Sequence, residues 1–339
     1  MHNESGLPRR QVGSGSITRR MLLGAAAAVA ATPAFAEECH IGPPAHAQGP
    51  RVWLDMDQVE LDAAYDQSLY APLAGQIRAR FAGNSEQVRA RLGAPQRVAY
   101  GPSELERLDI YRTKRPKAPI FIYFHGGAWL RGSAADSGFP AEMFVNAGAH
   151  FLVADFVGLG AANGDLRVMA EQVRRAIAWC YSNAAIFDGD PDRLYIGGHS
   201  SGGHLCGVAL VTDWKRDFGL PETIVKGALC ESGMYDLKPV RVSARSKYVK
   251  FTDEIEHAMS PQRHLELLRA PVVVTYGTNE TPEFQRQSRD FAAAVKAAGK
   301  QVELIVAENQ NHFETEESLG NPYGLNGRAA LALMKVAPA

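Results

Sequence analysis

Short apolar runs alternate with segments of helical spacing from Gly101 to the end of the chain. Nearly continuous apolar runs of this kind are typical of strands buried on both faces. Helical spacing between the runs, as at Leu166, Met169 and Val173, predicts helices that cover a parallel sheet. The expected fold class is therefore α/β, with a mostly parallel central sheet and helices on both faces. The predicted strands lie in Pro119 to Gly127, His150 to Phe156, Arg193 to Ser200, Val225 to Gly233, Ala270 to Gly277 and Gln301 to Glu308.

Two regions depart from this alternation. Runs at Arg97 to Tyr100 and Leu108 to Tyr111, separated by Gly-Pro and charged residues, can pair as a hairpin at the sheet edge. The segment Leu237 to Leu268 is rich in Arg, Lys and Ser, lacks a strand-like run, and has Pro261 at a plausible first helical position. We expect it to form a short, cap-like excursion over the sheet.

The N-terminal region is expected to divide from the α/β domain. Residues 1–36 resemble a signal peptide, residues 37–95 form a leader and a helical segment, and residues 96–339 form the α/β domain. Three aromatic residues of this region, Trp53, Tyr65 and Tyr70, either pack on the sheet or reach a site, and packing is favoured.

The first 36 residues carry the features of a twin-arginine export signal. Arg19 and Arg20 precede an alanine-rich apolar run from Met21 to Ala31, and the small-residue pattern Ala34-Phe35-Ala36 follows. The run is shorter than the roughly 20 residues that a spanning helix needs, so a stable membrane anchor is not expected. The alternative is an alanine-rich soluble helix with a chance arginine pair. The signal predicts a periplasmic or secreted protein.

Composition excludes several classes of partner. The chain has 339 residues, 46% of them hydrophobic and 22% charged, and a formal net charge of −1, which is ordinary for a soluble globular protein. Without a basic surplus, nucleic acid is not an expected partner. No group of His, Cys and carboxylate residues shows metal-ligand spacing, so neither a metal nor a cofactor is predicted.

The four scattered cysteines favour buried thiols over a disulfide framework.

The stretch Tyr195 to Gly207, YIGGHSSGGHLCG, contains the pattern G-x-S-x-G directly after a predicted strand. In that context the pattern predicts a nucleophile elbow, a strained turn that projects Ser200 from the sheet. Glycine is needed at 198 and 202 because side chains there would collide with the neighbouring backbone. Ser200 is the predicted nucleophile.

A second glycine-rich loop, FHGGAW, follows an earlier strand. Its His-Gly-Gly resembles the oxyanion-hole motif of lipases and esterases, in which backbone N–H groups approach the substrate carbonyl oxygen. Gly126, Gly127 and Ser201 are therefore the predicted oxyanion donors. A plain strand-to-loop turn is the alternative. Candidates for contacting the substrate from these two loops are His125, Trp129 and His199.

His312 is the predicted base, because it follows the last strand and satisfies the chain order serine, acid, histidine. Two carboxylates compete for the acid. Glu280 follows the strand at Ala270 to Gly277, and Asp236 follows the preceding strand. Asp155, at the end of its own strand, is expected to be structural.

The motifs HGGAW, GHSSGGH, GTNETPEFQRQS and NHFE, with the earlier ELDAAYDQSLYAP, are similar to the arylformamidase (kynurenine formamidase-like) branch of the α/β-hydrolase superfamily. The similarity extends from about Met56 to the end of the chain. It implies an α/β-hydrolase fold and places Ser200, Glu280 and His312 at the triad positions. Glu280 stands where the family usually has aspartate, and Ala128 where a bulkier aromatic often follows the glycines.

We therefore expect a serine hydrolase that cleaves a small carboxylic ester, or an aryl amide, formamide or carbamate, through an acyl-enzyme. Its partner is a small-molecule substrate. The charged excursion at 237–268 disfavours long acyl chains. The alternative is a non-catalytic protein of the same fold that binds a ligand, a class that commonly lacks one triad member.

Overall fold

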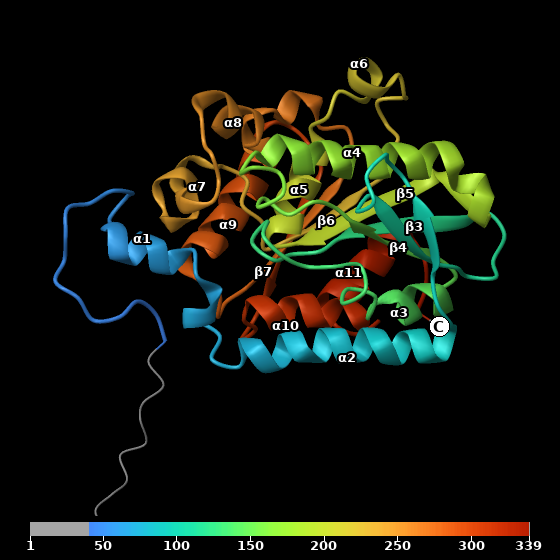
Figure 1. The fold of residues 1–339 in the computed structure, drawn as a ribbon, viewed down its shortest axis with the longest axis horizontal. Coiled ribbons are helices and arrows are strands. Elements are labelled where there is room, and N and C mark those ends of the chain that lie inside the picture. Colours follow the sequence, from blue (N-terminus) through green and yellow to red (C-terminus); the bar gives the residue numbers. More distant parts are fainter. Residues whose placement is uncertain (1–40, 339) are drawn as a thin grey trace, which may run out of the picture. The chain divides into compact units, whose positions relative to one another are not determined.

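The chain is organised around a mixed sheet in a computed structural model that describes residues 41–338. Within that range the sheet has eight strands in the order β1-β2-β4-β3-β5-β6-β7-β8. Antiparallel pairing is confined to β1 with β2 and β2 with β4, and the remaining neighbours are parallel (Figure 1). The strands are β1 (Gln96–Ala99), β2 (Arg107–Tyr111), β3 (Ala118–Phe124), β4 (His150–Asp155), β5 (Gly189–His199), β6 (Ala228–Glu231), β7 (Val272–Gly277) and β8 (Val302–Ala307).

Each predicted strand is present, and the hairpin at the sheet edge is confirmed as β1 and β2. The prediction that every parallel strand is buried on both faces is wrong for β8. This strand has only β7 as a neighbour, and Glu303 and Leu304 are exposed. An edge strand that borders solvent tolerates polar side chains that a central strand cannot.

Two apolar layers sandwich the sheet because successive strand residues point to opposite faces. On β3, Ile120 and Ile122 belong to one cluster, whereas Phe121 and Tyr123 belong to the other. The first cluster packs under helices α4 (Leu166–Asn183), α5 (Ser201–Leu210) and α9 (Pro282–Ala297). The second packs against α3 (Ala141–Asn146), α11 (Leu325–Met334) and part of α2 (Ala74–Leu92), which lie on the other side of the sheet (Figure 1).

The register of the parallel strands brings the ends of several strands together. Phe124 at the end of β3 pairs with Gly198 of β5, and His199 pairs with Glu231 of β6. Since the carboxyl ends of parallel strands meet at one edge, the loops that follow β3, β5, β7 and β8 all open there.

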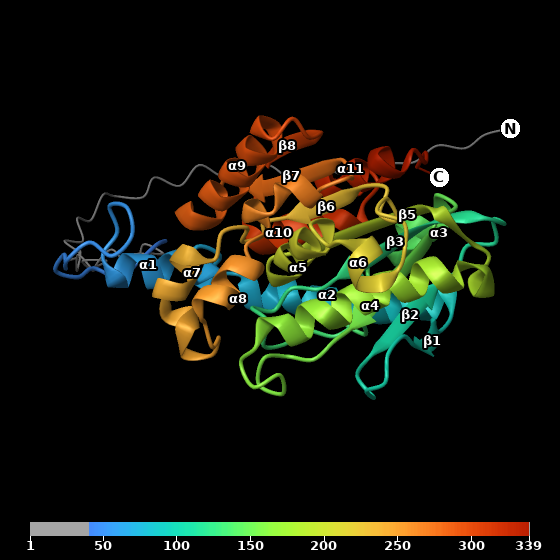
Figure 2. The same cartoon turned by 90° about the horizontal axis from the view of Figure 1, so that it is seen from above.

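Residues 237–268 form the predicted excursion, without a strand. The excursion touches α1 (Gln58–Ala64): Gln58 donates to the Val242 carbonyl, and the Ala244 N–H donates to Asp62 (Figure 2). Its elements are α7 (Lys238–Val242), η3 (Ala244–Lys247), α8 (Asp253–Ala258), η4 (Pro261–Arg263) and η5 (Leu265–Leu267). Pro261 stands at the start of η4, as predicted.

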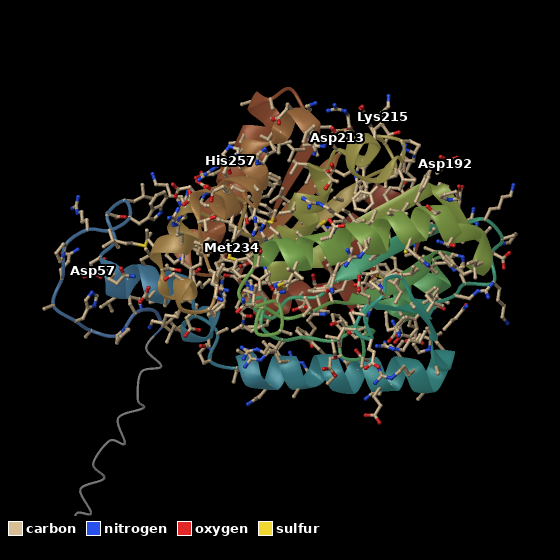
Figure 3. All side chains as sticks on the ribbon, turned by 45° about the horizontal axis from the view of Figure 1, so that its top comes forward. Asp57, Asp192, Asp213, Lys215, Met234 and His257 are labelled. Carbon is tan, nitrogen blue, oxygen red and sulfur yellow. The ribbon has the colours of Figure 1, made fainter. Side chains whose placement is uncertain are left out.

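The remaining helices are short. Asp57, labelled in Figure 3, caps α1 by accepting from the Glu60 N–H, and Glu60 returns a bond to the Asp57 N–H. Such a reciprocal capping box fixes where a helix begins. The other elements are η1 (Gln67–Leu69), η2 (Ala184–Phe187), α6 (Trp214–Phe218), α10 (His312–Glu317) and η6 (Ser318–Gly320).

Three further sequence predictions concern the chain as a whole. Cys180, Cys206 and Cys230 are buried free thiols, as expected for core positions. Within residues 41–338, none of the helices has the length and hydropathy required to cross a bilayer. The predicted export signal at 1–36 lies outside the described residues.

Candidate active site

Ser200 lies at a sharp turn between β5 and α5. Its backbone has φ 57° and ψ −119°, a conformation that a serine rarely adopts, and its N–H donates to the Glu231 carbonyl at 2.8 Å. Strain of this kind persists only where the surrounding structure enforces it, and it is common at active sites. The turn lifts the Ser200 side chain from the end of the sheet into a cavity that Ser200 lines.

The glycines beside Ser200 are needed for close packing, as the sequence predicted. A Cβ atom on Gly198 would lie 2.5 Å from the Gly202 carbonyl oxygen and 2.8 Å from that of Phe124. A Cβ atom on Gly202 would clash still more closely with the Phe124 carbonyl oxygen. Helix α5 can therefore start directly against β3 only if both positions lack a side chain.

The loop after β3 lies against the Ser200 turn. A Cβ atom on Gly126 would approach Ser200 Cβ to 3.3 Å, so the loop backbone passes beside the nucleophile candidate. Gly127 has φ 119°, a conformation that favours glycine. Among the described residues, the N–H groups of Gly126, Gly127 and Ser201 donate to no protein acceptor. These donors are free to bind an oxyanion next to Ser200.

The structure places Glu280 against His312. His312 begins helix α10, where Asn311 caps the first turn, and Glu280 follows β7. The His312 Nδ1–H donates to Glu280 Oε2 at 2.8 Å, while Oε1 of the same carboxylate accepts from the Ser232 hydroxyl and the Gly277 N–H, both at 2.6 Å. Both side chains are buried. This contact fixes the imidazole orientation and leaves its Nε2 available as a base.

The groups that contact the Glu280 carboxylate favour its ionised form. Burial would raise the pKa of this carboxyl group, but the His312 imidazole and the hydrogen bonds from Ser232 and Gly277 hold the pKa below its usual value. Ser200 and His312 line the same cavity. The structure describes both side chains and shows no direct hydrogen bond between them. Catalytic hydrogen bonds of this kind often form only when the substrate binds.

The rival acid lies elsewhere. Asp236 accepts from Arg263 Nη2 at 2.6 Å and from the Lys238 N–H, and it does not contact His312. Asp155, which we expected to be structural, accepts from the Ala134 N–H at 2.6 Å and pairs with Arg97. The local contacts therefore favour Glu280 over Asp236 as the partner of the histidine.

A second histidine–carboxylate pair lies directly beside the first. The His199 and His312 ring centroids are 4.3 Å apart. His199 Nδ1 forms an ion pair with Glu316 Oε2 at 2.9 Å. His199 Nε2 lies 2.8 Å from the His312 carbonyl oxygen. Since both ring nitrogens face acceptors, His199 is held as the doubly protonated imidazolium.

The two rings consequently differ in their proton affinity. Burial would lower the pKa of His199, but the Glu316 carboxylate raises it to about 9. Burial and the adjacent His199 charge lower the pKa of His312 to about 4. Near neutral pH, His312 is therefore a neutral base beside a fixed cation.

The cavity in front of these groups has a volume of about 1000 Å³. His125 and His199 line it, as expected of candidates for substrate contact. Trp129 does not support its predicted role in substrate binding: its side chain is only 1% exposed, and its Nε1–H donates to His204 Nδ1 at 3.2 Å. The indole therefore packs in the core behind the site and does not line the cavity.

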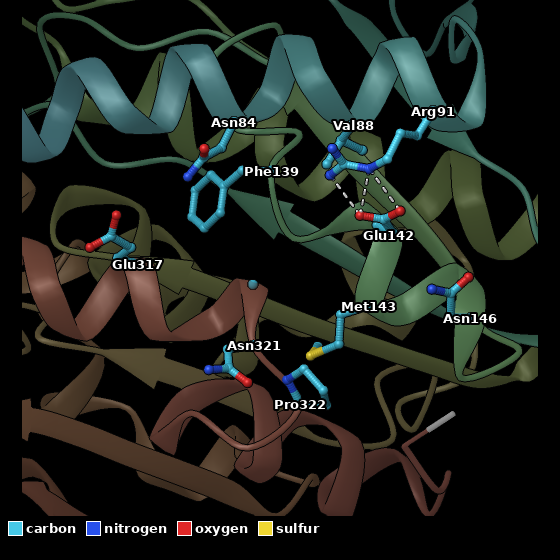
Figure 4. A pocket seen from close by; sticks show the side chains of 11 residues that line it. Asn84, Val88, Arg91, Phe139, Glu142, Met143, Asn146, Glu317, Asn321 and Pro322 are labelled. Atoms are coloured by element: carbon cyan, nitrogen blue, oxygen red, sulfur yellow. Dashed lines mark hydrogen bonds and ion pairs between the residues drawn. The ribbon is translucent and has the colours of Figure 1, made fainter. Parts of the chain in front are cut away.

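A separate hollow of about 380 Å³ lies between α2, α3 and residues 317–322. Figure 4 shows it, with the Arg91–Glu142 ion pair at one side. None of the predicted site residues lines this hollow. Residues 41–338 also contain no cluster of three or more His, Cys, Asp or Glu side chains that could hold a metal ion. The predicted chemistry therefore converges on the larger cavity alone.

Comparison with known proteins identifies the family. The BD-FAE family matches residues 108–232. The chain is 34% identical over 281 residues to a kynurenine formamidase of Danio rerio, an alignment that covers 79% of this chain and 93% of that protein. This chain belongs to the kynurenine formamidase-like and esterase branch of the α/β-hydrolase superfamily.

Other members of the superfamily agree with this assignment. Esterase LipC of Mycobacterium tuberculosis is 29% identical over 249 residues, which cover 68% of this chain and 60% of that protein. The crystal structure of EstE1, a thermostable carboxylesterase from a metagenomic library, superposes with a TM-score of 0.60 at 20% identity, covering 77% of this chain and 94% of EstE1. The α/β-hydrolase fold is thereby confirmed, and the chain is an enzyme of the hydrolase class.

The His199–Glu316 pair and the buried Glu231 near it were not predicted from the sequence. Glu316 stands four residues after His312, a spacing that puts both on one helix face, so the sequence signalled a carboxylate near the predicted base but not its pairing with His199. Glu231 ends the buried strand β6, where burial raises its pKa to about 8. A carboxylate in an otherwise apolar strand is a signal of a buried polar network.

Proposed function

We propose that this α/β-hydrolase cleaves a small carboxylic ester, or an aryl amide, formamide or carbamate, with Ser200 as nucleophile, His312 as base and Glu280 as the acid of a Ser-His-Glu triad. The observation that carries the proposal is the buried Glu280–His312 hydrogen bond at 2.8 Å, formed in the cavity that the strained Ser200 lines. The names of its relatives, a formamidase and esterases, support the same substrate classes.

In the first half of the reaction, the Ser200 hydroxyl attacks the substrate carbonyl carbon while His312 Nε2 takes its proton. The negative charge that develops on the carbonyl oxygen is bound by the N–H groups of Gly126, Gly127 and Ser201. His312 then gives the proton to the leaving alcohol or amine as the ester or amide bond breaks. The product of this half-reaction is an acyl-enzyme on Ser200.

Water completes the cycle. His312 takes a proton from water as the oxygen attacks the acyl carbon, and returns this proton to Ser200 as the acid product leaves. Glu280 holds the imidazole in orientation and stabilises the imidazolium that forms twice per turnover. No metal or cofactor takes part in this scheme.

Ser200→Ala tests the nucleophile. The variant should fold normally and lose turnover of 4-nitrophenyl acetate and of formanilides, because it lacks the hydroxyl proposed to attack the substrate carbonyl. Wild-type enzyme should gain one fluorophosphonate adduct at Ser200, located by peptide mass spectrometry. An adduct at Ser201, or substantial activity of pure Ser200→Ala, would contradict the proposed nucleophile.

We also propose that the protein is exported by the twin-arginine route through Arg19 and Arg20. Replacing both arginines with lysine keeps the charge but removes the recognition signal, so the full-length protein should stay in the cytoplasm. Cell fractionation with activity measured in each fraction decides the question. Undiminished periplasmic recovery of the Lys-Lys variant would count against this route.

A further inference from the structure

Arg245 is a buried cation on the wall of the cavity that contains Ser200 and His312. It belongs to η3 in the excursion at 237–268, and only 8% of it is exposed. Nothing in the proposed hydrolysis uses a guanidinium at this position. Its presence in the wall of the cavity therefore needs a separate explanation.

The hydrogen-bond partners of Arg245 are neutral. Its Nη2 donates to the Tyr65 carbonyl oxygen at 2.9 Å and its Nη1 to the Tyr248 hydroxyl at 3.0 Å. The Nε–H is buried and has no acceptor, and no carboxylate of residues 41–338 forms an ion pair with Arg245. Burying a charge without a counter-charge is costly, so such a group in a cavity wall suits an anionic ligand.

Aromatic rings surround the Arg245 guanidinium. Two of these rings belong to residues next to the oxyanion loop and His312. The guanidinium Cζ atom lies 5.5 Å from the centroid of the Trp129 ring and 6.0 Å from that of Phe284. Trp129 follows the glycines of the oxyanion loop, and the Phe284 ring lies 5.0 Å from the His312 ring. Cation–π contacts compensate part of the desolvation cost, but they offer no acceptor to the Nε–H.

The other charged groups of the cavity leave room for an anion. Four carboxylates line the cavity, and each already has a partner within the protein. Glu316 pairs with His199, and the other three accept hydrogen bonds, Asp62 from the Ala244 N–H, Asp66 from the Ser68 N–H and Asp136 from the Ser133 hydroxyl. Apart from His199, the other cations that line the cavity form no ion pair among the described residues. These cations are Arg78, Arg131 and Lys247. Unpaired positive charge in a cleft attracts and retains an anionic substrate.

We propose that Arg245 binds a carboxylate carried by the substrate, so that the enzyme prefers esters or aryl amides with a negative charge over neutral ones of the same size. This inference rests on the proposed hydrolysis at Ser200. A guanidinium recognises a carboxylate through charge-assisted hydrogen bonds, for which the free Nε–H supplies a donor. Arg245 is thus a residue that determines specificity.

Matched substrates test this preference. The pair 4-acetoxybenzoate and 4-acetoxybenzamide places the charge on the leaving group, and the pair 4-nitrophenyl hydrogen adipate and 4-nitrophenyl hexanoate places it on the acyl group. The wild-type enzyme should show at least about tenfold higher kcat/KM for the anionic member of one pair. Equal kcat/KM within both pairs would overturn the proposal while leaving the hydrolase assignment intact. Failure to turn over any ester would instead contradict the proposed function.

Arg245→Gln should abolish the preference by lowering kcat/KM for the anionic ester about tenfold or more, with the neutral ester changed little. If Arg245 only fastens the excursion to Tyr65, both esters should lose activity together, which would overturn the proposal. Arg241→Gln is the matched control. It makes the same charge change in the same segment, but Arg241 pairs with Asp253 and Glu256 and does not line the cavity. It should keep the preference.

A second measurement needs no variant and remains decisive if Arg245→Gln does not fold. Hydrolysis of 4-nitrophenyl acetate by the wild-type enzyme should be inhibited by 4-hydroxybenzoate or adipate at concentrations at least about tenfold lower than by the neutral 4-hydroxybenzamide or adipamide. Equal inhibition by the neutral and anionic compounds would overturn the proposal.

Discussion

Two histidine–carboxylate pairs lie side by side in this enzyme and differ in one respect. Each ring is buried and within 3 Å of a glutamate, Glu280 for His312 and Glu316 for His199. His312 has one acceptor, so its second nitrogen is left to face the cavity, whereas His199 has an acceptor at each nitrogen. The number of acceptors therefore decides which ring carries an extra proton. One pair is suited to move a proton and the other to hold one.

The neighbours of each carboxylate reinforce this difference. Glu280 accepts from Ser232 and from the Gly277 backbone, so its charge is spread over short bonds from three donors. Glu316 has the Tyr123 hydroxyl at 3.0 Å and the His199 cation. A cation beside His312 disfavours a second positive charge in the resting enzyme. His312 is thereby kept neutral, as the proposed transfer of the Ser200 proton to it requires.

The largest expected effect comes from breaking the His312 pair. Glu280→Gln should lower kcat by several orders of magnitude, on the order of 10⁴, because an amide fixes the wrong imidazole tautomer and cannot stabilise the imidazolium. Steady-state kinetics with 4-nitrophenyl acetate measure the loss. Asp236→Asn is the control, since Asp236 contacts Arg263 and not His312. A greater loss for Asp236→Asn than for Glu280→Gln would require a different triad.

Most of the fold was predictable from the sequence because its signals are local. The apolar runs identified every parallel strand, and the glycines around Ser200 identified a turn whose close packing tolerates no Cβ. The strand pattern alone left Glu280 and Asp236 open, since both follow neighbouring strands, and only the family resemblance favoured Glu280. The choice depends on which strand end lies nearer His312, which is a matter of sheet order and loop path.

The His199–Glu316 pair and the burial of Arg245 could not be predicted from the sequence for a similar reason. His199 was recognised only as a flanking residue, because its protonation depends on Glu316 and on the His312 carbonyl, both more than 100 positions away. Arg245 lies in a segment whose many charges resemble an ordinary solvated surface. Its burial follows from contacts with Tyr65 and Trp129, on distant parts of the chain.

The His199 pair should have the next largest effect, on stability rather than on rate. Because the pKa of His199 is raised to about 9, its contribution is fully present below about pH 6.5 and is lost as the pH rises through 9. The free energy of unfolding in urea should therefore differ between wild type and His199→Gln by on the order of 3 kcal/mol more at pH 6 than at pH 10. A difference that does not change with pH would mean that His199 is neutral in the folded enzyme.

The smallest effect concerns the pH profile of the reaction and links the two pairs. The sequence alone predicts an acid limb at the usual histidine value of roughly 6 to 7. The lowered pKa of His312 instead predicts a limb of kcat/KM near pH 4, with activity present above this pH and lost as the pH falls through it. His199→Gln removes the adjacent cation, so the limb should move upward, and at pH 5 the variant should keep about half of its own plateau activity. His257→Gln, on helix α8 of the excursion (Figure 3), is the control and should leave the limb in place. Profiles over pH 3 to 8, with folding checked by circular dichroism at each pH, make the measurement. If the wild-type limb lies near pH 6.5 and is unmoved in His199→Gln, the His199 charge does not act on the base.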